Sequence, residues 1–212
     1  LRATAPSFTR CTWNLKPPFF YSEQAKPNLI GGLVQGNSTA NDGIFTSNNA
    51  KDFNFEGASV EDGTVAATYT EHTSLDGSAL SAGTGMGAFT TIFALAYDTQ
   101  PSLESLAGIY DGKSGTPENG TEGVESTTLT VLPSGAFSGF SGIANSCIFS
   151  GTTTPRARGN IFDLSVTFTG APPCLHAGET LAGIAYLDAN RLLTAALTST
   201  RSDVVIFTGI RR

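Results

Sequence analysis

The second half of the chain alternates apolar and polar residues in short segments, and this pattern constrains the fold more than any other feature. In the clearest segment, IFDLSVTFT at 161–169, Phe162, Leu164 and Val166 share one face. A period of two residues is typical of a β-strand with one buried face, and turn-forming residues separate the segments. Strands are therefore predicted at Leu106–Tyr110, Glu125–Leu132, Ala136–Phe140, Ile148–Thr154, Ile161–Thr169, Leu181–Leu187, Leu192–Leu197 and Val204–Gly209.

Strands that follow one another in this way favour an antiparallel up-and-down arrangement. Eight of them can close into a small barrel, and closure removes the exposed edges that an open sheet leaves. A β-sandwich of the same strands is the alternative. The predicted fold class is all-β and antiparallel, with an eight-stranded up-and-down barrel in the C-terminal part.

The first half has the same texture, so two similar β-modules are predicted. The polar segment 98–106 is the best boundary, and Pro101–Glu104 within it can open one helical turn capped by serine. We expect an irregular arm at 1–25, an N-terminal module at 26–101 and a C-terminal module at 102–212. Strands of the first module are expected at Leu29–Val34, Ile44–Thr46, Phe53–Phe55, Val65–Glu71, Ser78–Ser81 and Phe89–Tyr97, the last with a short helix as its alternative.

The chain carries little charge, and its balance is acidic. Charged residues make up 14% of the 212 residues, and the formal net charge is −6. Binding to nucleic-acid phosphates requires clustered Lys and Arg, so no nucleic-acid partner is expected. The pairs Arg156/Arg158 and Arg211/Arg212 are interpreted as a solvated turn and a solvated terminus.

No segment predicts a transmembrane helix, because no apolar run approaches the roughly 18 residues that such a helix needs. Residues 1–10 also lack the apolar core of a signal peptide. If the protein is exported, we expect its signal peptide to have been removed before Leu1. Cys11 follows Arg10 rather than a small residue, so no lipid attachment is predicted there.

Two of the three cysteines flank a pair of predicted strands. Cys147 begins one strand, and Cys174 follows the next strand 27 positions later. Zinc sites and thioredoxin-like centres need paired ligands such as C-x-x-C, so no metal is predicted here. A disulfide suits the strands and predicts an oxidising, extracytoplasmic compartment. Two separate buried thiols are the alternative, and Cys11 is the odd thiol.

Several segments resemble a group of secreted or lipoprotein-like all-β proteins of proteobacteria. The segments are SLAGIYDG at 105–112, TLTVLPSGAFSG at 128–139, SCIFSGTTTPRARGNIFDLSVTF at 146–168 and APPCLHAGETLAGIAYLD at 171–188. The likeness covers about Phe20 to Thr208 and is most specific between Cys147 and Cys174. It implies an extracytoplasmic location and a paired Cys147–Cys174, and it implies no activity. Residues 1–19 depart from the pattern.

No catalytic constellation is predicted. The segment GFSG at 139–142 is one residue short of the G-x-S-x-G elbow of serine hydrolases. His72 and His176 are the two histidines, and Glu71, Glu179 and Asp163 are candidate acid–base partners. Nothing in the spacing brings these residues together. Both histidines are therefore expected in exposed loops.

Three other features are candidate sites for a metal, a sugar or a nucleotide. The loop DGKSGTPENGTEGVE at 111–125 offers carboxylates for calcium, but not at EF-hand spacing, so a mobile acidic loop is the preferred interpretation. The adjacent Glu61 and Asp62 should point to opposite sides and so cannot flank a glycosidic bond. GTGMG at 83–87 lacks the full phosphate-binding spacing. No cofactor and no metal is predicted. The loop carboxylates are Asp111, Glu118, Glu122 and Glu125.

Two main functional hypotheses follow. The first is an exported, non-enzymatic binding or structural β-protein that holds a small ligand, a glycan or another protein at a barrel mouth or in loops. The second is a hydrolase with a site assembled from loop residues, against which the scarcity of histidine and the missing motifs weigh. A self-assembling surface or filament subunit is a further alternative to the first.

Overall fold

The computed structural model describes residues 19–22, 30–83, 85–120, 124–142, 147–157 and 159–212. The chain divides into two compact units. The first comprises Leu1–Tyr97 with Pro117–Thr121, and the second comprises Asp98–Thr116 with Glu122–Arg212. Both units consist almost entirely of antiparallel strands, so the predicted fold class is confirmed.

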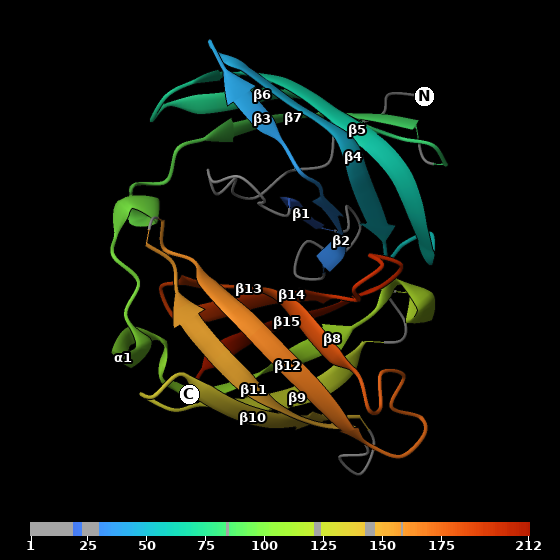
Figure 1. The fold of residues 1–212 in the computed structure, drawn as a ribbon, viewed down its shortest axis with the longest axis vertical. Helices are drawn as coiled ribbons and strands as arrows, with labels where there is room; N and C mark the ends of the chain where they lie inside the picture. Colours follow the sequence, from blue (N-terminus) through green and yellow to red (C-terminus); the bar gives the residue numbers. More distant parts are fainter. Residues whose placement is uncertain (1–18, 23–29, 84, 121–123, 143–146, 158) are drawn as a thin grey trace. The chain divides into compact units, whose positions relative to one another are not determined.

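The second unit contains a closed eight-stranded barrel (Figure 1). Each strand pairs with its neighbours in the sequence, and β15 closes the barrel by pairing with β8. This is the predicted up-and-down barrel and not the alternative sandwich. The strands are β8 (Gly108–Gly115), β9 (Glu125–Val131), β10 (Ala136–Ser141), β11 (Cys147–Pro155), β12 (Phe162–Gly170), β13 (Thr180–Asp188), β14 (Arg191–Leu197) and β15 (Val204–Arg211).

Because the strands alternate in direction, their connections gather at two ends of the barrel. We call one the helix end, where the short helix α1 (Leu103–Leu106) leads into β8. We call the other the disulfide end, where the β12–β13 loop (171–179) and the β14–β15 loop (198–203) lie. Apolar residues on alternate positions of every strand form one core cluster inside the barrel.

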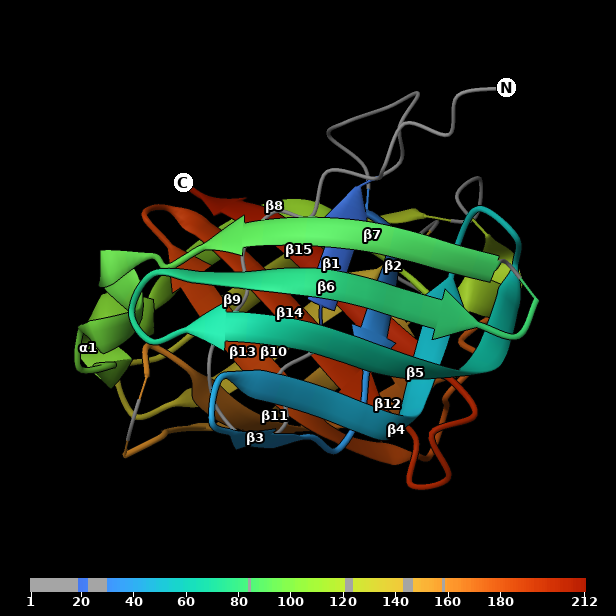
Figure 2. The same ribbon diagram turned by 90° about the horizontal axis from the view of Figure 1, so that it is seen from above.

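The first unit is an open, curled sheet. Its strand order is β1-β2-β4-β5-β6-β7, with β3 beside β4, and Figure 2 shows β4 to β7 running side by side. Its core cluster includes Phe45, Val65, Leu75 and Phe89. The strands are β1 (Phe19–Ser22), β2 (Ile30–Gln35), β3 (Thr39–Asn41), β4 (Ile44–Asn54), β5 (Ser59–Thr70), β6 (Ser74–Ser81) and β7 (Gly85–Ile92).

The segment expected as one strand at Phe89–Tyr97 is divided. β7 ends at Ile92, and the 3₁₀ helix η1 follows at Leu95–Asp98. The reason is the length of the neighbouring strand: the last ladder bond runs from the Phe93 amide to the Thr73 carbonyl, beyond which β6 offers no partner. A second short 3₁₀ helix, η2, spans Pro117–Asn119.

The predicted helical turn in the boundary segment is confirmed as α1. Ser102 caps it, its hydroxyl accepting a hydrogen bond from the Ser105 amide at 3.2 Å. Leu106 was expected to begin a strand, but it ends α1 and is fully buried, and the strand begins at Gly108. Of the predicted arm at 1–25, residues 1–18 and 23–25, with Cys11, lie outside the described residues, and Phe19–Ser22 forms β1.

Cys147 and Cys174 form a disulfide, as the sequence predicts. It joins the start of β11 to the β12–β13 loop, with a Cα–Cα distance of 4.9 Å. Both residues are buried and belong to the core cluster of the barrel. The disulfide therefore fixes the first part of that loop to the barrel wall, and the alternative of two separate thiols does not hold.

Candidate functional site: the interior of the barrel

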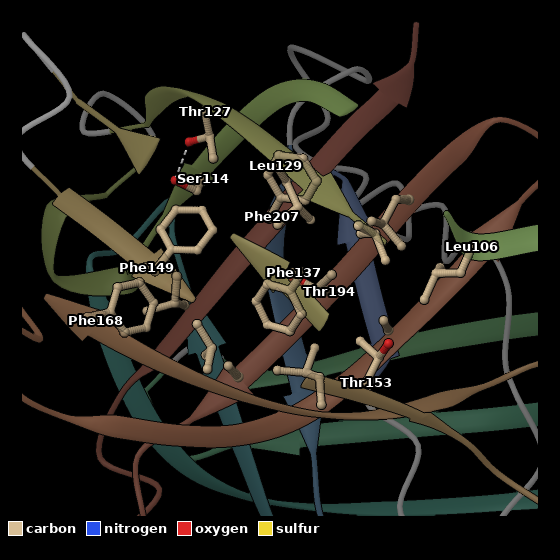
Figure 3. A pocket seen from close by; sticks show the side chains of 17 residues that line it. Leu106, Ser114, Thr127, Leu129, Phe137, Phe149, Thr153, Phe168, Thr194 and Phe207 are labelled. Atoms are coloured by element: carbon tan, nitrogen blue, oxygen red, sulfur yellow. Dashed lines mark hydrogen bonds between the residues drawn. The ribbon is translucent and has the colours of Figure 1, made fainter. Parts of the chain in front are cut away.

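Large aromatic side chains face glycines across neighbouring strands inside the barrel. In the β10–β11 register, Phe137 lies opposite Gly151, and Gly139 lies opposite Phe149. A methyl group added to either glycine would meet the facing phenylalanine ring and a backbone carbonyl oxygen. The two glycines therefore provide the space for the rings, which line the interior (Figure 3).

These side chains leave a cavity of about 50 Å³ inside the barrel. Its wall is mostly apolar, with phenyl rings from β10, β11, β12 and β15. A space of about 10–15 Å³ can already hold one water, but a cavity with apolar walls stays dry and favours apolar guests. The phenyl rings belong to Phe137, Phe149, Phe168 and Phe207.

The residues that line the cavity extend along much of the barrel interior. Its lining runs from Leu106 of α1 to Ser114 and Phe168 near the disulfide end, and on β11 alone it runs from Phe149 to Thr153. Four residues of a β-strand span about 13 Å. An apolar lining without a charged side chain suits an aliphatic guest better than a charged one.

One end of the cavity carries a neutral polar pair. The hydroxyl oxygens of Ser114 and Thr127 lie 2.6 Å apart, and both residues are buried (Figure 3). The Thr127 hydroxyl also lies 3.3 Å from the Glu125 carbonyl oxygen, to which it can donate. Ser114 then donates to Thr127 and keeps its lone pairs free. No described residue that lines the cavity is charged.

At the helix end, α1 is held onto the barrel by a buried tyrosine. The Tyr110 hydroxyl donates to the Leu106 carbonyl oxygen at 2.7 Å. The Arg211 guanidinium donates to the same hydroxyl at 2.7 Å and also to the Ser105 carbonyl oxygen. Arg211, which the sequence places in a solvated terminus, thus fastens the helix that covers this end, and that prediction is wrong for Arg211.

At the disulfide end, the β12–β13 loop brings His176 between two carboxylates. Its Nδ1 lies 3.2 Å from Glu179 Oε2 in the same loop, and its Nε2 lies 3.0 Å from Asp203 Oδ2 in the β14–β15 loop. His176 is 8% exposed. Its ring centroid lies 6.0 Å from that of Phe168, which lines the cavity.

The two carboxylates favour a protonated imidazole. The hydrogen bond to Asp203 raises the pKa of His176 above its ordinary value of 6.5, burial opposes this increase, and Glu179 adds to it. A protonated imidazole has two N–H donors and can donate to both carboxylates, whereas a neutral one has a single donor. The observed geometry therefore matches the charged form.

The predicted exposed loop position is wrong for His176 and confirmed for His72, whose side chain is 60% exposed. Among the candidate partners, Glu179 contacts His176, whereas Asp163 accepts a hydrogen bond from Arg156 at 2.8 Å. Sequence reasoning missed Asp203, because the contact depends on two loops that meet only when the barrel closes. It also missed the Ser114–Thr127 pair: alternation with Leu129 places Thr127 on an inward-facing position, but Ser114 fell in the predicted loop at 111–125, whereas β8 extends to Gly115.

The carboxylates of the predicted acidic loop are spread over several elements. Asp111 lies on β8, where Arg212 and Thr128 donate to it at 2.7 and 2.9 Å, and the bond from Arg212 holds the pKa of Asp111 below its ordinary value. Glu125 begins β9, and Glu118 lies in η2. Glu122 is outside the described residues. Within the described residues, no group of three or more His, Cys, Asp or Glu side chains is arranged to hold a metal ion.

The fold and the cavity define an eight-stranded antiparallel barrel with an apolar interior. A comparison with protein-family models found no match to the chain, and a comparison with curated proteins found none either. In the described part of the chain, no helix is long and apolar enough to cross a membrane. We therefore infer the function from the barrel itself.

Proposed function

We propose that the protein is an exported, non-enzymatic binding protein whose C-terminal barrel holds an unbranched aliphatic chain. The apolar cavity inside this barrel carries this proposal. An eight-stranded barrel is just wide enough to be filled by its own side chains or to hold one small ligand. The Cys147–Cys174 disulfide supports export, because such bonds persist in oxidising compartments. The resemblance to secreted β-proteins supports the same compartment.

The polar pair at one end defines the ligand further. Ser114 and Thr127 offer a buried, uncharged hydrogen-bonding group near the disulfide end. A ligand hydroxyl there would find a partner, whereas a carboxylate would be buried without a cation and would lose its hydration. The preferred ligand is therefore an aliphatic chain with a neutral polar end, such as a fatty alcohol.

A series of primary alcohols from 1-butanol to 1-decanol tests this proposal by isothermal titration calorimetry. Each methylene that enters the cavity should lower Kd about fourfold, from about 0.8 kcal/mol per buried CH₂, until the cavity is full. Cyclohexanol and octanoate should bind more weakly than 1-octanol. Native mass spectrometry of protein from its own source should show a bound mass that is lost on denaturation.

Matched alanine variants locate the binding site. Ala185 faces the cavity on β13, whereas Ala182 is an exposed residue on the opposite face of the same strand. Ala185→Leu should weaken 1-octanol binding at least tenfold by filling the cavity, and Ala182→Leu should bind as the wild type does. Ala196→Leu, on the next strand, serves if the first variant does not fold. The proposal would be refuted if the Kd for alcohols did not depend on chain length, or if both cavity variants bound 1-octanol as tightly as the wild type does.

Self-assembly is a second candidate function, and an edge strand of the first unit favours it. Within the described residues, β7 pairs with β6 alone. The strand has no charge and no proline, the usual protections of a sheet edge, and its Met86 and Ile92 side chains are 72% and 79% exposed. A strand of this kind can pair with the same strand of a second copy.

The hydrogen-bond pattern of β7 provides a test. The Phe93 amide donates to β6, at the Thr73 carbonyl, so in an antiparallel pair the Thr90 amide points away from β6. Thr90→Pro therefore removes an outward donor and spares the existing ladder, while Thr90→Ala keeps that donor. Light scattering should show a mass that rises with concentration for the wild type and Thr90→Ala only. A constant monomer mass for the wild type would exclude assembly.

A further inference from the structure

An aliphatic chain would have to enter the barrel at one of its two ends, where α1 and the loops lie. At the helix end, the chain runs directly from α1 into β8, and Leu106 is fully buried beneath Tyr110 and Arg211. At the disulfide end, His176 joins the β12–β13 loop to the β14–β15 loop, and its side chain is the type that changes charge near neutral pH. The disulfide end is therefore the one where a contact between loops can change with pH.

His176 joins two loops that are otherwise separate in sequence. It links the β12–β13 loop, where Glu179 is the other titratable residue, to Asp203 in the β14–β15 loop. Arg201 is the other charged residue of the β14–β15 loop. The side chain of Asp203 is 15% exposed and that of Glu179 is 54% exposed. The contact with Asp203 is thus the better shielded of the two.

Loss of the imidazole proton changes these contacts in a defined way. A neutral imidazole keeps one N–H donor and presents a lone pair at its other nitrogen. The donor is expected to remain on Nε2, facing the more buried Asp203, so that Nδ1 then points its lone pair at the Glu179 carboxylate 3.2 Å away. One attractive contact becomes repulsive, and the other loses the positive charge of its donor while its carboxylate acceptor stays ionised.

The wall of the cavity is directly connected to this contact. Phe168 packs on His176 and also on Phe149, with a centroid distance of 5.6 Å between the two phenyl rings. The Gly178 amide donates to the Phe168 carbonyl at 2.9 Å, and the Phe168 amide donates to the Glu179 carbonyl at 3.0 Å. A movement of the loop after Cys174 would therefore move a ring that lines the cavity.

We propose that the β12–β13 loop is the entrance cap of the barrel and that His176 is its latch, which holds the cap on the β14–β15 loop while the imidazole is charged and loosens it when the imidazole is neutral. The disulfide keeps Cys174 on the barrel wall, so the opening is confined to the stretch that follows it. The role of the cap as an entrance rests on the proposed function, whereas the latch can be measured without any ligand.

The direction of the pH effect follows from the raised pKa of His176. The contribution of the latch is complete below the ordinary value of 6.5 and is lost as the pH rises through the higher value in the folded protein. The cap should accordingly be closed at pH 6 and looser at pH 9. Release of a bound chain should be faster at the higher pH.

Two measurements on the full chain test the latch. The first is hydrogen exchange of the Gly178 amide, expressed as a protection factor corrected for the intrinsic pH dependence of exchange. The second is the dissociation rate of 1-octanol, measured by NMR exchange. From pH 6 to pH 9, protection should fall about fivefold and release should accelerate about fivefold, the change expected when a partly exposed ion pair loses its positive charge.

The two histidines provide a matched pair of variants. His72→Gln, in the exposed loop of the first unit, should behave as the wild type does. His176→Gln should show weak, pH-independent protection of Gly178. Asp203→Asn should move the midpoint of the pH dependence of Gly178 protection to lower pH, an effect that a merely structural contact would not produce. This variant also provides the test if His176→Gln does not fold.

The outcomes separate the latch from the ligand. Protection of Gly178 that does not change with pH in the wild type, or that still changes in His176→Gln, would overturn the latch. Octanol release that is independent of pH while Gly178 protection titrates would overturn the entrance role of the cap. Absence of alcohol binding at any pH, together with titrating protection, would overturn the proposed function and support the latch.

Discussion

Removal of the Cys147–Cys174 disulfide is predicted to destabilise the second unit by about 3.5 kcal/mol. The bond closes a loop of 27 residues. In the chain-entropy description, closing such a loop removes about 12 cal/mol/K from the unfolded chain, or about 3.5 kcal/mol at 25 °C. Alanine is the better replacement because both cysteines are buried in the core, where a serine hydroxyl would need a partner. The variant is therefore Cys147→Ala/Cys174→Ala.

Urea unfolding followed by far-ultraviolet circular dichroism measures the effect. With a slope of about 1–3 kcal/mol per M urea, the midpoint of the second unit should fall by about 1–3.5 M. Reduction of the wild type should lower its midpoint to that of the double variant, and the variant should not respond to reductant. A separate transition of the first unit, where one is resolved, should not move.

Two results would refute this reasoning. Equal midpoints for oxidised and reduced wild type would show that the bond does not restrict the unfolded chain as calculated. Alkylation of the denatured but unreduced protein should modify Cys11 alone. Modification of all three cysteines would exclude the disulfide and, with it, the support that it gives to an extracytoplasmic location.

Three further predictions concern the barrel. Gly151→Ala should lower the free energy of unfolding in urea by about 1–3 kcal/mol, because the added methyl group displaces the Phe137 ring. An unchanged urea midpoint would contradict the position of this ring opposite Gly151. Tyr110→Phe should cost about 1–3 kcal/mol by leaving the Leu106 carbonyl without its donor, and amide exchange in α1 should accelerate with it. The difference in unfolding free energy between wild type and His176→Gln should shrink from pH 6 to pH 9. The pKa of His176 is raised in the folded protein, and the stabilisation by the charged imidazole is lost as the pH rises through that raised pKa. A constant difference would argue against the charged imidazole.

Much of the fold could be predicted from local pattern. The alternation at 161–169 anticipates β12 to within one residue at each end, the segment at 192–197 anticipates β14 equally well, and the segment at 204–209 ends two residues before β15 does. The capped turn at Ser102 and the pairing of Cys147 with Cys174 were also anticipated. These features depend on which face of a segment is apolar and on which residues favour a turn, and both are local properties. The chain by itself therefore determined an antiparallel all-β protein with a disulfide, and it left a sandwich as the alternative to the barrel.

Only the tertiary structure decided the site. Closure pairs Gly209 of β15 with Gly112 of β8, and this contact between distant segments sets which inward residues share one interior. The cavity is the small difference between the enclosed volume and the volume of the side chains, so it depends on all eight strands together and on no single segment. His176 meets Asp203 for the same reason: two loops far apart in sequence come together only when the register of the closed barrel brings their ends to one side. Local pattern determines which residues point inward, and closure determines what they surround.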